Sequence, residues 1–259
     1  MIGSSGPRVV IQERDRRLLQ ELGVMRVIDR EQAKLIAGFR STTRANARLL
    51  ALTQAGVLTK FFVGTIVGGR KAIYSLSPKG AYIGGIPYRA FPRRHTGFVS
   101  RDLFFEHQFL INSIYTPLKY RPAPDPAVHF RGWRNFQEPI SRTTALIPDG
   151  YFELDTRDGI RPMFLEVDLG TETIRIWRKK IEGYLRFAIS GDFIALFQHS
   201  QFRVLVVTTS ERRLNQIRSA VARSTAKIFW FSTFQFINRD GFWSPIWWRP
   251  QGNQKHTLL

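Results

Sequence analysis

Cysteine is absent from the sequence, which excludes disulfide bonds, thiolate zinc sites and cysteine nucleophiles. Long apolar runs are absent too: no stretch reaches the roughly 18 residues that a membrane-spanning helix needs. The N-terminus also lacks the apolar core of a signal peptide. We therefore expect no membrane partner, and a cytoplasmic location fits these absences.

Acidic residues are scarce relative to basic ones. Lys and Arg number 39 against 20 Asp and Glu, which gives a formal net charge of +19. No acidic residue occurs between Glu31 and Asp102. A surface with charge of one sign favours a polyanionic partner, and nucleic acid fits best, although such a run can also be a solvated face. The cations in this stretch are Lys34, Arg40, Arg44, Arg48, Lys60, Arg70, Lys71, Lys79, Arg89, Arg93, Arg94 and Arg101.

Three short helices are predicted near the N-terminus, because apolar residues recur there at helical spacing and each run ends at a glycine. Polar residues that suit helix N-caps precede the second and third runs. The predicted helices are 14–22, one capped by Asp29 and ended by Gly38, and one capped by Ser41 or Thr42 and ended by Gly56.

Two extended runs follow, 57–63 and 71–76, with several glycines between them. They predict a basic two-stranded wing. Helices followed by such a hairpin are typical of a winged helix-turn-helix, in which the second helix of the motif enters the major groove. We assign this domain to residues 8–80.

The predicted DNA contacts fall on the third helix, the turn before it and the wing. Arg44 and Arg48, four residues apart, would meet the major groove, while the wing cations would contact phosphates. Alternatively, the fold serves as a protein-interaction module with solvated arginines. The predicted DNA-binding residues are Arg40, Ser41, Thr42, Arg44, Arg48, Lys60, Arg70 and Lys71.

Residues 81–98 are rich in glycine and proline and predict a linker. In residues 99–235, helical and extended patterns alternate. This order predicts an α/β (α+β) domain with a mixed central sheet. Residues 236–259 form an aromatic tail, which either packs on its own domain or serves as a protein–protein adaptor surface. Its large aromatic residues include Phe242, Trp243, Trp247 and Trp248.

A hairpin in the second domain gathers carboxylates. Strands are predicted on either side of an Asp158-Gly159 turn, which would set Asp149 opposite Asp168. Side chains two apart on a strand share a face, so Glu166 would join them. Three acids on one face repel one another, and a bound divalent cation would relieve that repulsion.

Ile147-Pro148-Asp149, followed by Glu166-Val167-Asp168, resembles the signature of the restriction-endonuclease-like, or PD-(D/E)xK, nuclease superfamily. The resemblance implies Mg²⁺ or Mn²⁺ held by Asp149, Glu166 and Asp168, with Glu106 on a preceding helix as a further ligand. Asp168 stands where the superfamily has a lysine. Lys180, on the following helix, is the candidate to assist the attacking water in its place.

The combination of motifs is similar to one family in particular, the replication-relaxation proteins of plasmids and other mobile elements. It consists of the winged helix-turn-helix, Pro148-Asp149-Gly150, the run Glu-Val-Asp-Leu-Gly-Thr-Glu at 166–172, and Lys180 four residues before Tyr184. The similarity covers residues 8–232. It implies a role in replication or mobilisation of an element.

Three functional hypotheses follow. The first is a DNA-binding protein whose nuclease-like, metal-binding domain has lost its chemistry. The second is an active Mg²⁺-dependent endonuclease or nickase with Asp149, Glu166, Asp168 and Lys180 as catalytic residues. The third is an adaptor within a larger nucleoprotein complex. DNA is the expected partner, together with other proteins of a replication, mobilisation or defence complex.

Overall fold

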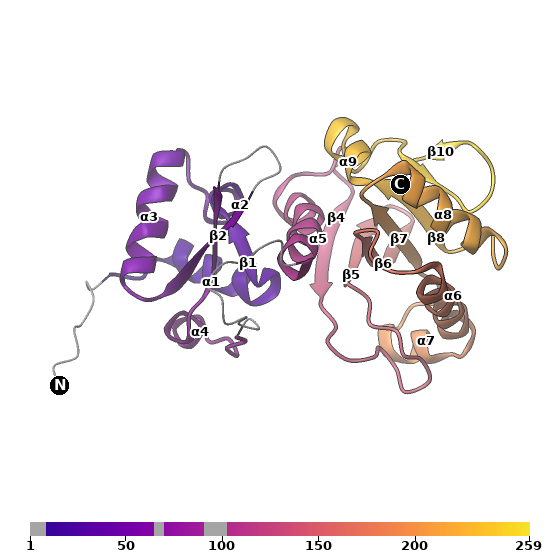
Figure 1. Ribbon diagram of the computed structural model, residues 1–259, viewed down its shortest axis with the longest axis horizontal. Coiled ribbons are helices and arrows are strands. Elements are labelled where there is room, and N and C mark those ends of the chain that lie inside the picture. Colours follow the sequence, from indigo (N-terminus) through magenta and orange to yellow (C-terminus); the bar gives the residue numbers. More distant parts are fainter. Residues whose placement is uncertain (1–8, 65–69, 91–102) are drawn as a thin grey trace. The chain divides into compact units, whose positions relative to one another are not determined.

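The computed structural model describes residues 9–64, 70–90 and 103–259. The chain divides into two compact units, Met1–Tyr120 and Arg121–Leu259, and Figure 1 shows the elements of each. The tip of the predicted wing, 65–69, and the second part of the predicted linker, 91–98, lie outside the described residues.

The three predicted N-terminal helices are present. They are α1 (Glu13–Met25), α2 (Arg30–Ala37) and α3 (Thr42–Gln54). Asp29 caps α2 by accepting a hydrogen bond of 2.8 Å from the amide of Gln32. The helix ends at Gly38, whose φ of 66° is one that glycine adopts without strain. Ser41, one of the two predicted caps, accepts a bond from the amide of Arg44 and begins α3.

Both predicted strands of the hairpin are present as β2 (Leu58–Gly64) and β3 (Arg70–Leu76). Within the described part of the first unit they belong to a three-stranded antiparallel sheet, with β3 in the centre. The additional strand is β1 (Val27–Asp29), which pairs with β3 along its whole length and is buried. Three residues are too short a run to show strand periodicity in the sequence.

The segment predicted to begin the linker is partly helical. Helix α4 (Pro78–Gly84) starts at Ser77, whose hydroxyl accepts a bond of 2.9 Å from the amide of Gly80. A Cβ atom on Gly80 would lie 2.1 Å from the carbonyl oxygen of Val57, so the helix approaches the residue before β2 this closely only because residue 80 is glycine.

Helix α5 (Leu103–Tyr120) falls in the first unit, whereas the sequence placed residues 99–120 in the second domain. Asn112 on α5 donates hydrogen bonds to the carbonyl oxygens of Met25 (3.1 Å) and Val27 (2.7 Å). These contacts join residues distant in sequence, so local patterns could not reveal them. Neither α5 nor any other helix among the described residues has both the length and the apolarity to cross a membrane.

The described strands of the second unit form a seven-stranded mixed sheet in the order β10-β9-β8-β7-β6-β5-β4, which confirms the mixed sheet that the sequence predicted. Neighbours β6, β7 and β8 are parallel, while β4, β5 and β6 are antiparallel. The elements are β4 (His129–Arg134), β5 (Gly150–Thr156), β6 (Gly159–Asp168), α6 (Ile174–Ile189), α7 (Asp192–Phe197), β7 (Arg203–Thr208), α8 (Glu211–Ala222), β8 (Phe229–Thr233), α9 (Phe234–Asp240), β9 (Trp247–Trp248) and β10 (Lys255–His256).

The hairpin of β5 and β6 has a register two residues away from the predicted one. Thr156 pairs with Gly159, so Arg157 and Asp158 form the turn, and the predicted Asp158-Gly159 turn is wrong. Gly159 has a φ of 103° and follows the turn. A shift of two residues keeps every side chain on its predicted face, because strand side chains alternate with a period of two.

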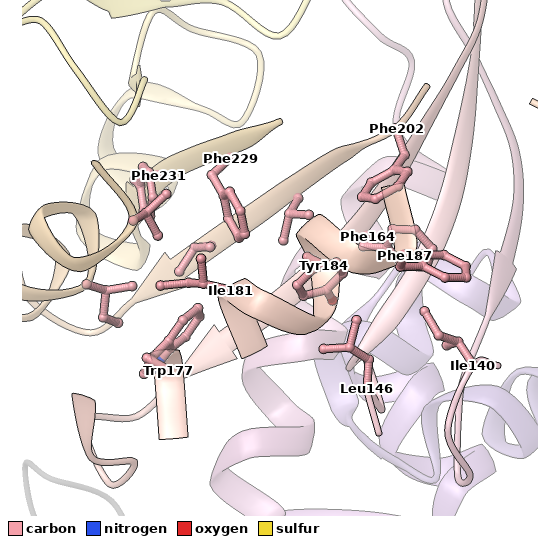
Figure 2. Packing of buried hydrophobic residues seen from close by; sticks show 14 of the residues in the cluster. Ile140, Leu146, Phe164, Trp177, Ile181, Tyr184, Phe187, Phe202, Phe229 and Phe231 are labelled. Atoms are coloured by element: carbon pink, nitrogen blue, oxygen red, sulfur yellow. The ribbon is translucent and has the colours of Figure 1, made fainter. Parts of the chain in front are cut away.

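The core of the second unit lies between the sheet and helices α6, α7 and α8. Figure 2 shows Trp177, Ile181 and Tyr184 of α6 facing Phe229 and Phe231 of β8. All five side chains are at most 1% exposed. At roughly 25 cal/mol per Å² of apolar surface, these large side chains provide much of the hydrophobic stabilisation. The core thereby fixes the face of α6 that carries Lys180.

The aromatic tail is part of the second unit. Trp248 of β9 pairs with Phe231 of β8, and β10 pairs with β9 at the edge of the sheet. Trp247 is fully buried and donates a 2.9 Å hydrogen bond to the carbonyl of Phe242. These aromatic side chains therefore pack mainly within their own unit, and the observation that suggested an adaptor surface has a structural explanation.

Candidate functional site

Helix α3 has one buried and one exposed face. Its buried residues Ala45, Leu49 and Leu52 face the core of the first unit. Thr43, Asn46 and Ala47 are exposed, and Leu50 is 50% exposed. Because successive residues turn by about 100° around a helix, these four lie on the side away from the buried stripe. The sequence assigned no contact to this face and grouped Leu50 with the buried stripe because it is apolar. That grouping is wrong, since Leu50 lies about 140° around the helix from Ala45.

The two predicted major-groove arginines differ in their surroundings. Arg44 is exposed, as is Arg40 before the helix, and neither makes an ion pair with any residue the structure describes. Arg48 borders the buried stripe and binds Asp15 of α1 through both carboxylate oxygens, with an Nε–Oδ1 distance of 2.9 Å. The side chains of Arg48 and Asp15 are only 15% and 1% exposed. Arg48 therefore holds α3 against α1.

The polar residues at the start of α3 are engaged locally. Besides capping the helix, Ser41 is partly buried, and the hydroxyl of Thr42 accepts a 3.2 Å hydrogen bond from Lys34. Both residues lie where the turn after α2 meets α3, and their hydrogen bonds stabilise this turn.

The hairpin carries exposed cations on its described part. The Lys60 ammonium lies 4.8 Å from the ring centre of Phe62, whose side chain is 52% exposed. Lys71 makes an ion pair with the α2 cap Asp29, and Arg70 is exposed. Phe62 was not singled out by the sequence, because apolar residues surround it and only alternation along the strand distinguishes it from the partly buried Phe61.

In the second unit, Glu166 lies on β6 against helix α6. Its carboxylate accepts hydrogen bonds from Lys180 (2.9 Å) and from the Tyr184 hydroxyl (2.6 Å). Burial raises the pKa of Glu166 to about 7, an effect that Lys180 opposes and Asp149 reinforces. The sequence prediction that Lys180 acts beside the acids of the hairpin therefore agrees with its position, while its role remains a prediction.

Lys180 contacts a second carboxylate that the sequence did not assign to the site. Its ammonium lies 2.9 Å from Glu166 and 2.9 Å from Glu172. Burial acts to lower the pKa of Lys180, but the neighbouring carboxylates outweigh it and raise the pKa. The other oxygen of Glu172 is buried without a hydrogen-bond partner. Lys180 is therefore held as a cation between two acids.

Asp168 is fully bonded within the protein. Arg213 of α8 donates to both of its carboxylate oxygens at 2.7 and 2.8 Å, and the indole of Trp177 and the amide of Gly170 each donate at 2.7 Å. Burial acts to raise the pKa of Asp168, yet these hydrogen bonds prevail and hold the pKa below its ordinary value. Arg213 was missed by the sequence because it lies 45 residues away from its partner.

Asp149 lies at the start of β5 and joins it to β6. Its carboxylate accepts a 2.7 Å hydrogen bond from the amide of Val167, next to Glu166. The following glycine is required by packing, because a Cβ atom on Gly150 would lie 2.3 Å from the ring of Trp133. The Pro-Asp-Gly motif therefore places Asp149 within electrostatic range of Glu166 and Lys180.

The residues predicted to hold Mg²⁺ or Mn²⁺ do not fit such an ion as they are placed. Asp168 is committed to Arg213, and Glu166 to Lys180 and Tyr184. Glu106 lies exposed on α5, an element of the first unit. Among the residues that the structure describes, no three His, Cys, Asp or Glu side chains are grouped in a way that could hold a metal ion.

Comparison with known proteins gives one informative result. No curated protein and no solved structure matches the chain. The family model described as replication-relaxation matches residues 17–195, which covers α1 through most of α7 and includes both the exposed face of α3 and the site around Glu166. On the strength of this match over more than half of its length, the chain belongs to the replication-relaxation family.

Proposed function

We propose that this protein binds duplex DNA through its first unit and acts in the replication or mobilisation of a plasmid or another mobile element. The observation that carries the proposal is the solvent-exposed face of α3, which follows α2 in a helix-turn-helix order and precedes the hairpin of β2 and β3. This order supports a winged helix-turn-helix with α3 in the major groove. Membership of the family supports the biological setting.

The distribution of charge supports DNA rather than an uncharged partner. Arg40, Arg44 and Lys60 are exposed, and none of them makes an ion pair with a described residue. The stretch that contains them has no acidic residue, so an acid that neutralised them would have to come from another part of the chain, as Asp15 does for Arg48. Exposed cations of this kind neutralise phosphates and release counterions, which is the main source of affinity for DNA.

The test is fluorescence anisotropy with a labelled duplex and the full chain. Replacing Arg40, Arg44 and Lys60 together by Ala should weaken binding at least 10-fold, because about one phosphate contact is lost with each. Arg223→Ala, which removes an exposed arginine at the end of α8, is the matched control and should bind like the wild type. Equal affinity of the triple variant and the control would reject the assignment of DNA binding to the first unit.

For the second unit, we propose a nuclease-like domain that does not cleave DNA. The position of Asp149 at the start of β5, with Glu166 and Asp168 on the adjacent β6, supports the nuclease-like assignment. The ion pairs of these acids support the loss of activity, because Asp168 is paired with Arg213 and Glu166 with Lys180. A metal ion would have to displace both cations.

Incubation with supercoiled plasmid in Mg²⁺, Mn²⁺ or EDTA separates this proposal from the active nuclease. We expect DNA binding without nicking in all three conditions. Metal-dependent nicking that is lost in Asp149→Ala and Glu166→Ala, while both variants still bind DNA, would establish a nuclease. The full chain should be used, since both units contribute to the outcome.

A further inference from the structure

We infer that α3 selects A·T base pairs in the major groove, with Asn46 as the residue that reads adenine and its apolar neighbours as contacts for thymine methyl groups. The inference rests on the proposed DNA binding and names the sequence class that the same surface would prefer. It follows from which side chains of α3 are exposed to solvent and from the binding of Arg48 to Asp15.

The centre of the exposed face carries no charge. Thr43, Ala47 and Leu50 form it, with Asn46 at its edge, on the side of the helix away from the buried stripe of Ala45, Leu49 and Leu52. The Asn46 amide makes no hydrogen bond with any described residue, so its donor and its acceptor are both available. In the major groove an asparagine amide pairs bidentately with N6 and N7 of adenine.

The remaining side chains of this face offer methyl groups. Leu50 is 50% exposed although it is a large apolar residue, and Ala47 and Thr43 lie about one and two turns of helix before it. Thymine is the base that presents a methyl group in the major groove, and alanine and threonine methyl groups are typical contacts for it. Burial of Leu50 against thymine methyls would remove its apolar surface from water.

Guanine is read most often by arginine or lysine. Of the two arginines of α3, Arg48 is not available to contact a base. Arg48 is bound to Asp15 and points toward α1. Arg44 and Asn46 lie on opposite flanks of the exposed face, each about 100° around the helix from the buried Ala45. The centre of the face, formed by Thr43, Ala47 and Leu50, therefore offers no donor pair for guanine, and the Asn46 amide at its edge offers the donor and acceptor that adenine needs.

The charges near the exposed face of α3 favour DNA as its partner. Arg40, just before α3, and Arg44, on the flank of the exposed face, are exposed cations of a stretch without acidic residues. A nonpolar centre with cations at its edge is complementary to a groove whose floor holds methyl groups and whose edges are phosphates. A protein partner would have to supply several carboxylates around an apolar centre, and it would show no preference among duplexes.

The test begins with selection of bound duplexes from a pool with a randomised centre, using the full chain. Sites bound by the wild type should be enriched in A·T pairs with at least one fixed adenine. Asn46→Ala should lose the preference for that adenine and bind the selected site roughly 5- to 100-fold more weakly. Asn238→Ala, which changes an exposed asparagine of α9, is the matched control. It should keep the preference for adenine and the wild-type affinity for the selected site.

A second measurement needs no variant. Replacing thymidine by deoxyuridine in the selected site removes only the methyl group, and it should weaken wild-type binding about 4-fold for each contacted methyl. Leu50→Ala should reduce this difference, because one partner of the methyl contact is gone.

The outcomes separate the inference from the proposed function. Enrichment of G·C pairs, or no enrichment while binding persists, would overturn A·T selection and leave DNA binding intact. If the wild type binds the deoxyuridine site as tightly as the thymidine site, α3 does not contact thymine methyl groups. If the wild type binds no duplex at all, both the inference and the proposed function fail.

Discussion

Single residues in this protein are often held by partners that the sequence places far away. Asp168 and Arg213 form a buried, doubly hydrogen-bonded pair between β6 and α8, and Arg48 and Asp15 form a similar pair between α3 and α1. Removal of one member of such a pair leaves the other as a buried charge without compensation. Both pairs therefore act on stability, although the sequence suggested a ligand role for Asp168 and a DNA contact for Arg48.

Arg213→Met should destabilise the protein by about 3–5 kcal/mol, because Asp168 would remain buried with its charge uncompensated. Urea unfolding measures the effect. Arg212→Met, which changes an exposed arginine of the same helix, is the control and should cost less than about 1 kcal/mol. An equal effect of the two substitutions would show that the Asp168 pair contributes nothing to stability.

The stability that Glu166 confers should depend on pH. Burial raises its folded-state pKa to about 7, above its ordinary value near 4.3, so the folded protein holds a proton that the unfolded chain has lost between these values. Raising the pH through this window therefore reduces stability. We expect the wild type to lose stability relative to Glu166→Gln between about pH 5 and pH 8, as measured by thermal unfolding. A constant difference between the two proteins would contradict the raised pKa.

At the scale of elements, α5 shows how tertiary contacts decide the extent of a domain. Its Phe105 packs in one cluster with Val27 of β1 and Ile73 of β3, and Asn112 bonds the chain between α1 and β1. These contacts cover one side of the hairpin of β2 and β3. Lys60 and Phe62 of β2 are exposed on its other side. The first unit therefore includes α5 in addition to the three N-terminal helices and the hairpin.

Asn112→Ala should weaken the first unit by about 1–3 kcal/mol, because the carbonyl groups of Met25 and Val27 would stay buried without donors. Differential scanning calorimetry of the full chain measures this loss. Asn215→Ala on the exposed face of α8 serves as the control. If Asn112→Ala melts like the wild type, α5 is not anchored to this unit.

At the scale of the whole molecule, the net charge of +19 dominates the expected behaviour. Among the described residues after Glu31, the exposed cations Arg40, Arg44 and Lys60 make no ion pair, whereas Lys71 binds Asp29 from outside the acid-free stretch. Counterion release then makes DNA affinity fall linearly with the logarithm of salt concentration.

Affinity for a duplex should fall at least about 100-fold between roughly 50 and 200 mM salt, which four or more phosphate contacts would produce. Anisotropy titrations of the wild type in EDTA provide the measurement. A nearly flat salt response would contradict phosphate binding and leave a protein-interaction module as the better reading of the first unit.

Much of the local structure could be predicted from the sequence, because caps, glycine stops and apolar periodicity act over a few residues. Asp29, Gly38 and Ser41 mark the ends of α2 and α3 as predicted. The order of helical and extended patterns predicts the mixed sheet, and alternation along strands predicts that Glu166 and Asp168 share a face. The match to the replication-relaxation family confirms the resemblance carried by its motifs.

Partners distant in the chain were decided only by the tertiary structure. The alternation of side chains places Glu166 and Asp168 on one face, but the packing of α6 and α8 determines that Lys180 binds the first and Arg213 the second. Likewise, helical spacing identifies the buried Ala45, Leu49 and Leu52 of α3, while only the structure shows that Leu50 is exposed and that Arg48 is bound to Asp15 of α1. Local sequence patterns predict which side of a helix or strand is buried. They do not predict which charged side chain of another element pairs with a residue on that side, because the pairing depends on how the elements pack.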